Sequence, residues 1–277
     1  MVVVESAGMT DVGKRRKGNE DALYLDDQQG VYLVSDGMGG HRAGEVASEL
    51  VVKTIRDVMA GFENPAAAPP AAVDGSLSPV ADRLVRAIFE GNRKVFEAGR
   101  GKDAYRGMGA TVSAAVLTDK TLITANVGDS PIYLIHDGHI DQLSVTHNVV
   151  SEQSAFDPEA ASSLGEDVKY LLTRAMGIEE SVSPDVFELP FFRGDAVVIS
   201  SDGLSDLVSP EEIQAVVGEQ TADRACWKLV DMANQRGGHD NITVIVVKIK
   251  EIQQRWLIGK LRSGLARKAI GFLQRYL

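Results

Sequence analysis

The apolar residues of this chain gather in short runs rich in β-branched side chains. Six of these runs are continuous rather than alternating, which is typical of strands buried on both faces. A shorter alternating stretch, Ala22–Leu25, has the pattern of a further strand. The continuous runs are Val31–Ser35, Thr111–Leu117, Thr121–Val127, Ile132–Ile135, Ala196–Ser200 and Ile242–Ile249.

Four longer stretches have helical periodicity and helical start or stop signals. They are Gly44–Met59, Pro79–Ala98, Pro210–Gly218 and Thr221–Arg236. The strands come in groups and do not alternate strictly with these helices. This order favours an α+β fold in which one sheet packs on another with helices outside, over a doubly wound parallel fold.

The composition is that of an ordinary globular protein. The chain has 277 residues, of which 44% are hydrophobic and 25% charged, so intrinsic disorder and collagen-like structure are excluded. The apolar runs are too short to span a membrane, and no basic region precedes Val2–Val4, so we expect a cytoplasmic protein. The only cysteine, Cys226, lies among helix formers and is predicted to be a buried, inert thiol.

The negative charge is distributed unevenly. The chain carries −10 in total, yet residues 251–277 hold six Lys and Arg residues and one acid, a local charge of +5. Residues 1–250 therefore carry −15. We predict one domain over residues 1–250 and a separate basic extension over residues 251–277.

Acidic residues recur at the ends of the predicted strands. Asp36 and Asp202 each close an apolar run and precede a glycine that lets the backbone approach a ligand. Asp240, with Asn241, opens the run Ile242–Ile249. The other acids next to predicted strands are Glu20, Asp21 and Asp129.

Carboxylates brought together in this way repel one another, by about 4 kcal/mol per pair at 4 Å and an effective dielectric constant of 20. Cations must compensate this repulsion. Oxygen ligands without a Cys or His cluster favour Mg²⁺ or Mn²⁺ over Zn²⁺. A single Asp-Gly pair is more simply a turn, so the metal-site hypothesis depends on the strand ends converging.

Seven short motifs, taken together, resemble the metal-dependent PP2C (PPM) serine/threonine protein phosphatases in their bacterial form. The resemblance covers about residues 5–250, and it implies a four-layer α-β-β-α sandwich of two antiparallel sheets flanked by helices. The motifs, in chain order, are Arg16-Lys17-Gly18-Asn19-Glu20-Asp21, Ser35-Asp36-Gly37-Met38-Gly39-Gly40-His41, Gly109-Ala110-Thr111, Ala125-Asn126-Val127-Gly128-Asp129-Ser130, Thr173-Arg174-Ala175-Met176-Gly177, Ser201-Asp202-Gly203-Leu204 and Asp240-Asn241-Ile242-Thr243-Val244.

The resemblance assigns metal ligands position by position. Asp36 would bridge two Mn²⁺ or Mg²⁺ ions. The carbonyl of Gly37 and, through water, Glu20 would serve one ion, and Asp202 with Asp240 would hold the other. The two ions would present a bridging hydroxide in line with the phosphorus of phosphoserine or phosphothreonine.

Further roles follow from the same resemblance. Asp21 would support the metal ligands from outside the coordination sphere. Arg16 would hold the substrate phosphate by a bidentate contact that lysine cannot make, although it also belongs to an exposed basic run. Asp129 together with Asp202 would form a third, weaker metal site, with Asp206 a less secure addition.

Two departures from the family pattern concern proton donation and substrate choice. Met38 stands where eukaryotic members have a histidine, so we expect water to protonate the leaving group and interpret His41 and His239 as structural residues. The Asp-His-Ser motif that opens a flap in many bacterial relatives reads Thr146-His147-Asn148 here. The flap, about residues 146–172, would choose substrates and gate product release.

The implied partners are phosphorylated proteins and a cognate Ser/Thr kinase. A charge of −15 on the body disfavours a nuclease, because it would repel nucleic acid. Another alternative is a catalytically weak binding or regulatory module of the same fold. Loss of a bridging acid would mark such a module, and Asp36, Asp202 and Asp240 are all present.

The extension over residues 251–277 has the pattern of a basic amphipathic helix. Apolar residues recur at spacings of three and four, and the cations fall largely between them. Its apolar face could dock on the acidic body, lie on an anionic membrane or in a partner's groove, or pair with a second copy. The apolar positions are Leu257, Leu261, Leu265, Ala269, Phe272 and Tyr276.

Overall fold

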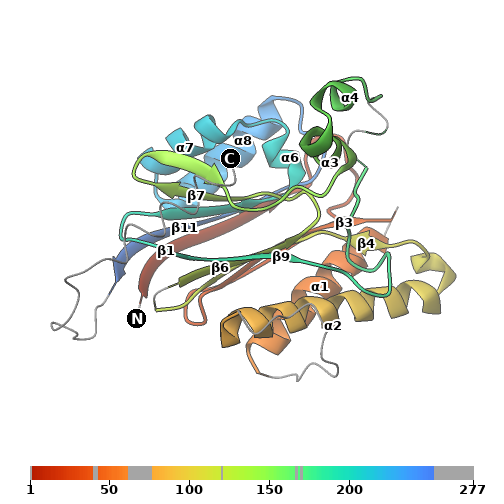
Figure 1. Cartoon of the computed structure of the whole chain (residues 1–277). Helices are drawn as coiled ribbons and strands as arrows, with labels where there is room; N and C mark the ends of the chain where they lie inside the picture. Colours follow the sequence, from red (N-terminus) through yellow and green to blue (C-terminus); the bar gives the residue numbers. More distant parts are fainter. Residues whose placement is uncertain are drawn as a thin grey trace.

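Two antiparallel sheets stack face to face, and helices cover both outer faces (Figure 1). The computed structural model describes residues 2–39, 43–61, 77–119, 121–165, 168 and 171–252. The four-layer α-β-β-α sandwich expected from the sequence is thereby confirmed. His41 and residues 253–277 lie outside the described residues.

The first sheet joins strands from both ends of the described chain. Its order is β1 (Val2–Asp11), β11 (Ile242–Ile252), β10 (Ala196–Ser200), β7 (Ile132–His136) and β8 (His139–Gln142). β1 and β11 pair along their whole length, from Val2 opposite Ile252 to Asp11 opposite Ile242.

The second sheet holds the first hairpin of the chain at its edge. Its order is β2 (Asp21–Asp26), β3 (Val31–Met38), β5 (Val112–Leu117), β6 (Thr121–Val127) and β9 (Asp185–Pro190), and the short β4 (Gly109–Ala110) pairs with the end of β3.

Helices α1 (Ala43–Met59) and α2 (Pro79–Gly101) cover the second sheet, whereas α6 (Asp202–Ser205), α7 (Pro210–Glu219) and α8 (Ala222–Gln235) cover the first. Local sequence fixes where several of them begin. The Ser78 side chain caps α2, and Ser209 with Glu212 forms a capping box ahead of Pro210 in α7. A short 3₁₀ turn, η1 (Asp103–Tyr105), follows α2, and α3 (Val149–Phe156) and α4 (Pro158–Ser162) project from one end of the sandwich (Figure 1).

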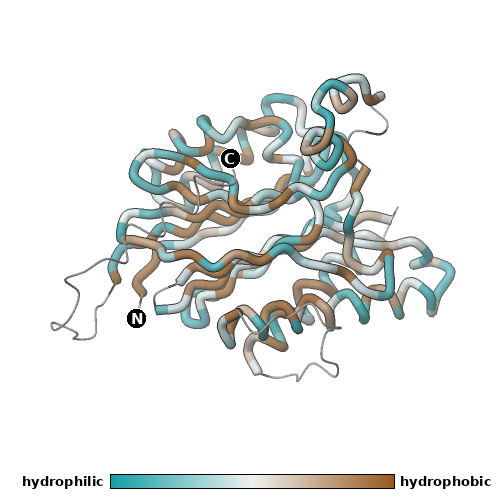
Figure 2. The backbone as a smooth tube through the Cα atoms, in the orientation of Figure 1, coloured by the Kyte–Doolittle hydropathy of each residue, from teal (hydrophilic) through white to brown (hydrophobic). Residues whose placement is uncertain are grey.

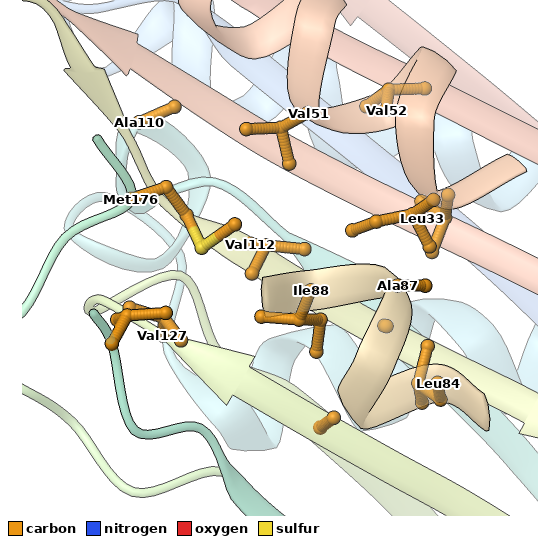
Figure 3. Packing of buried hydrophobic residues seen from close by; sticks show 14 of the residues in the cluster. Leu33, Val51, Val52, Leu84, Ala87, Ile88, Ala110, Val112, Val127 and Met176 are labelled. Carbon is orange, nitrogen blue, oxygen red and sulfur yellow. The ribbon is translucent and has the colours of Figure 1, made fainter. Parts of the chain in front are cut away.

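The central strands are buried on both faces, as their continuous apolar runs predicted. In β3, Val31 and Leu33 face the helices α1 and α2, while Tyr32 and Val34 face the other sheet. β11 alternates in the same way between α8 and the space between the sheets. Figure 2 shows the apolar positions concentrated along these strands. Figure 3 shows Val51 and Ile88 of the helices gathered with Leu33 of the sheet.

Two sequence expectations about the acidic strand ends need correction. Asp36 does not close its strand, because β4 pairs with Gly37 and Met38 and β3 therefore continues to Met38. Asp202 does not enter a simple turn but begins the helix α6. The two Asp-Gly segments therefore differ in backbone structure although both deliver a carboxylate to the same region.

The prediction for Cys226 is confirmed. The thiol is buried under α8, and burial raises its pKa to about 12, so the reactive thiolate is disfavoured. Across the part of the chain that the structure describes, no helix combines the length and the apolar character that crossing a bilayer requires.

Candidate metal centre

Carboxylates from both sheets meet at one end of the sandwich. Asp21 and Asp36 lie directly opposite each other on β2 and β3. Asp202 follows β10, and Asp240 stands two residues ahead of β11, so the other sheet supplies these two acids. The carboxyl groups of Asp36 and Asp202 lie within hydrogen-bonding reach of each other. The strand ends therefore converge, as the metal-site hypothesis requires.

Asp21 is the best-supported of these acids. The hydroxyls of Ser201 and Thr243 donate to its Oδ2 at 2.9 and 2.6 Å, whereas its buried Oδ1 accepts no hydrogen bond within the described residues. Burial raises its pKa to about 7, with the charges of Asp202 and Asp240 adding to the shift. Asp21 thus links β2 to the ends of β10 and β11.

Burial also raises the pKa of Asp36 well above its ordinary value, and the charges of Asp21 and Asp202 raise it further. The pKa of Asp202 is raised by burial and by the charge of Asp240. Like Asp21, it has one buried oxygen, Oδ1, that accepts no hydrogen bond in the described part of the chain.

Close backbone packing places Gly37 and Glu20 beside this cluster. The N–H of Gly37 donates to the carbonyl of Glu20 at 3.1 Å. A Cβ at Gly37 would collide with the carbonyls of Glu20 and Gly44, and a Cβ at Gly44 would collide with the Glu20 carboxylate. Glycine at both positions therefore allows β3, α1 and the Glu20 side chain to come together.

Arg16 lies at the rim, where one of its guanidinium nitrogens donates to Asp240 at 2.7 Å. The side chain of Asn241 braces the loop that carries Arg16, since its Nδ2 donates to the carbonyls of Val12 and Gly18, both at 3.0 Å. Its Oδ1 accepts from the N–H of Glu20 at 2.8 Å. One side chain thus holds the loop, the acidic hairpin and the start of β11 together.

Asp129 and Asp206 form a second acidic group around Asp202. Burial raises the pKa of Asp129 to about 7 and that of Asp206 to about 6, and the charge of Asp202 contributes to both shifts. His239 is exposed, and its proximity offsets only part of the rise in the pKa values of Asp202 and Asp206. The structure therefore brings the predicted third-site acids together around one shared carboxylate.

These residues fit divalent cations in donor type and in charge. The donors are oxygens, and the cluster holds more negative charge than Arg16 balances. Two buried carboxylate oxygens of the cluster also lack a hydrogen-bond partner among the described residues. As the side chains lie, no three His, Cys, Asp or Glu residues among those described are arranged to hold an ion. In this arrangement Arg16 is the counter-ion of Asp240, and two hydroxyls hold one oxygen of Asp21.

Sequence reasoning assigned no role to three residues that support the centre. Ser201, Thr243 and Asn241 stand inside motifs already noted, next to Asp202 and Asp240, and that adjacency was the available signal. Their contacts to Asp21 and Glu20 span about two hundred residues of sequence and follow only from the folded arrangement.

Known proteins of similar sequence and structure identify the family of this chain. The sequence model of protein phosphatase 2C matches residues 14–243. The serine/threonine phosphatase Stp of Listeria monocytogenes is 33% identical over 244 residues, covering 86% of this chain and 93% of that protein. The serine/threonine phosphatase PstP/Ppp of Mycobacterium tuberculosis superposes with a TM-score of 0.76 at 29% identity, covering 91% of this chain and all of that chain.

A further solved structure is the catalytic domain of the phosphatase PstP in complex with two manganese ions, at 27% identity and a TM-score of 0.75, covering 91% of this chain and all of that chain. These similarities confirm the enzyme class expected from the motifs, a serine/threonine protein phosphatase. The chain belongs to the protein phosphatase 2C family.

Proposed function

We propose that this protein hydrolyses phosphoserine and phosphothreonine in proteins, in a reaction that depends on Mn²⁺ or Mg²⁺. The observation that carries the proposal is the meeting of Asp21, Asp36, Asp202 and Asp240 from two sheets beside Arg16. Membership of the family and the manganese complex of PstP support it.

In this proposal Asp36 would be shared by two ions, Asp202 with Asp240 would hold one of them, and the carbonyl of Gly37 with Glu20 would serve the other. When bound, the ions would supply Lewis acidity that activates water and neutralises charge on the phosphate. Asp21 keeps Asp36 in place, because the two residues pair across β2 and β3 and Asp21 is itself held by Ser201 and Thr243.

Arg16 binds the phosphate in this mechanism. Its guanidinium has five donors, and one contact to Asp240 fixes its position while other donors stay available for phosphate oxygens. Asp240 therefore has two tasks, as a metal ligand and as the residue that orients Arg16.

The leaving alkoxide takes its proton from water. The thioether of Met38 has no proton to give, and its methyl group packs against Gly109. The role of His239 remains structural in this proposal.

The experiment that tests the function measures phosphate release from a phosphothreonine peptide and from an aryl phosphate, with Mn²⁺, with Mg²⁺ and with excess chelator. Activity with either ion, lost on chelation and restored by metal, is the expected result. Full activity after verified metal removal would contradict the mechanism.

The Asp129→Ala variant is expected to keep the fold and both core ions but to turn over phosphopeptides more slowly, by about tenfold at subsaturating metal. The reason is that Asp129 contributes only to the weaker position beside Asp202. Metal titrations of turnover, with ion binding followed by calorimetry, measure this. Unchanged turnover across the titration would reject the role of Asp129.

Reversal of a cognate Ser/Thr kinase in bacterial signalling is the physiological role that we propose. The similarity to the serine/threonine phosphatase Stp supports phosphoprotein substrates. Phosphoproteomes of a deletion strain and its parent identify the substrates, since phosphosites that depend on the enzyme are expected to accumulate in the deletion strain.

For the extension over residues 251–277 we propose docking on the acidic body or contact with an anionic membrane or partner. Full-length protein and a form ending at Ile252, the last residue of β11, are compared by co-sedimentation with anionic and neutral vesicles. Membrane contact predicts sedimentation of the full chain with anionic vesicles at low salt, and a soluble full chain contradicts it. Docking predicts that truncation lowers stability or solubility, and an unaffected truncated form contradicts it.

A further inference from the structure

The flap is closed at its base by a short stretch of strand-like pairing. It holds α3 and α4, and Asn148 and Leu172 form an antiparallel bridge where its two ends meet. The N–H of Val149 donates to the carbonyl of Leu171 at 3.0 Å, and the Asn148 side chain caps α3. The two ends of the flap are therefore joined directly at its base.

His147 lies next to this bridge and is completely buried. Its backbone N–H donates to the carbonyl of Gly128 at 3.0 Å, and its carbonyl accepts from the N–H of Thr173 at 3.0 Å. Its ring bonds in two directions as well: Nδ1 to the N–H of Gly128 at 3.0 Å and Nε2 to Oδ2 of Asp185 at 2.5 Å.

These partners define the tautomer of the ring. Because the N–H of Gly128 donates to Nδ1, the proton of the neutral ring is on Nε2 and is donated to Asp185. Asp185 begins β9 and also accepts from Arg174 at 3.1 Å, and the hydrogen bond from His147 lowers its pKa. The ring is thus fixed between the end of β6 and the start of β9.

The Gly128 turn leads directly to the acidic centre. Gly128 has φ +109°, and its close contact with Thr111 excludes a Cβ. The hydroxyl of Thr111 accepts from the N–H of Asp36 at 2.9 Å and shares a hydrogen bond with the Ser130 hydroxyl at 2.8 Å. Asp129 stands between Gly128 and Ser130, so hydrogen bonds hold the turn on both sides of it.

We propose that His147 is a positioning residue that fixes the base of the flap to the turn carrying Asp129, so that the position of the flap and that of Asp129 are set together. His147 touches neither substrate nor metal in this proposal and acts through Gly128 and Asp185. The consequence for Asp129 rests on the proposed function, whereas the mechanical link does not.

A pair of isosteric variants separates the two ring contacts. In His147→Gln the side-chain amide nitrogen can replace Nε2 as donor to Asp185, but no acceptor remains for the N–H of Gly128. In His147→Asn the side-chain oxygen can replace Nδ1, but the donor to Asp185 is lost. The matched control is His136→Gln. His136 is the last residue of β7 and forms the other His–Asp pair of the described chain, with Asp195 at 2.7 Å.

The first measurement is hydrogen exchange by mass spectrometry on the metal-free full-length protein. His147→Gln is expected to speed exchange at least tenfold in peptides covering residues 124–131 and 145–152. In His147→Asn the exchange rate of residues 124–131 is expected to stay within twofold of the wild-type rate. In His136→Gln the exchange rates of both segments are expected to stay within twofold. The proposal is overturned if both segments of His147→Gln exchange at the wild-type rate. It is also overturned if all three variants accelerate exchange equally.

The second measurement is a titration of phosphopeptide turnover with Mn²⁺. The quantity compared is the Mn²⁺ concentration that half-saturates the phase assigned to the weaker, third ion. His147→Gln is expected to raise this Mn²⁺ concentration at least fivefold, while calorimetry shows unchanged affinity for the two tighter ions. His136→Gln is expected to give the wild-type values. If exchange changes as expected but this concentration does not, the assignment of Asp129 to a metal site is overturned and the positioning role stands.

Asp185→Ala provides a second variant if His147→Gln does not fold, because the Asp185 side chain is 34% exposed and easier to replace. It frees the ring from the other side but, like His147→Asn, keeps an acceptor for the N–H of Gly128. Residues 124–131 are therefore expected to stay within twofold of the wild type, and exchange is expected to speed at least threefold in residues 145–152. Unchanged exchange there overturns the proposal.

Discussion

The Asp36→Asn variant is expected to lose at least about 10³-fold in phosphopeptide turnover and to bind fewer than two ions. Asp36 is the carboxylate that both sheets enclose, between Asp21 on its own sheet and Asp202 on the other. A neutral amide of the same shape cannot balance two divalent charges or bridge them with comparable strength. Steady-state kinetics at saturating Mn²⁺ and calorimetric ion counting measure both losses.

The matched control is Asp141→Asn, which removes an exposed carboxylate from β8 and is expected to behave as the wild type. Asp36→Asn activity within tenfold of the wild type, at unchanged metal content, would exclude the bridging role. A wild-type protein that binds phosphopeptide but releases no phosphate with any metal would instead favour the catalytically weak binding module.

The metal-free protein is expected to become less stable as the pH rises from about 5 to about 8. Asp129 has a pKa of about 7 in the folded protein and about 3.8 when unfolded, so the folded state binds more protons between these values. The protonated Asp129 carboxyl makes its full contribution to the free energy of unfolding below pH 4. This contribution falls as the pH rises and is lost above about pH 7. At about 1.4 kcal/mol per pKa unit, this group alone accounts for at most about 4 kcal/mol.

Thermal unfolding of chelator-treated protein measures this, with a fall of roughly 10 °C expected across the interval because Asp21 and Asp36 add to the effect. Asp129→Asn is expected to reduce the fall, and Asp141→Asn to leave it unchanged. Saturating Mn²⁺ is expected to flatten the profile, because bound cations favour the ionised carboxylates. A metal-free protein that gains stability between pH 5 and 8 would contradict the burial of these charges.

The fold could be predicted where burial shapes the sequence most strongly. β6 and β10 have the predicted bounds, because strands covered on both faces need apolar residues at every position. The edge strands β8 and β9 could not be predicted in this way. Their exposed positions break any continuous apolar run, so their identity as strands depends on pairing with β7 and β6.

The acids of the centre could be predicted from their places beside apolar runs, whereas their environment could not. The continuation of β3 through Asp36 depends on Gly109 and Ala110, more than seventy residues away. The hydroxyls that hold Asp21 come from beyond residue 200. The link from His147 to Gly128 requires the flap base and the end of β6 to be adjacent in space.

The pairing of β1 with β11 has a consequence for synthesis of the protein. Glu20 and Asp21 leave the ribosome early, but Asp240 and Asn241 come among the last of the described residues. Until β11 emerges, β1 and β10 lack the neighbour that joins them, and both present open edges that can pair wrongly. If the proposed function holds, a nascent chain lacks a complete acidic centre, and activity is expected only after β11 pairs with β1 and β10.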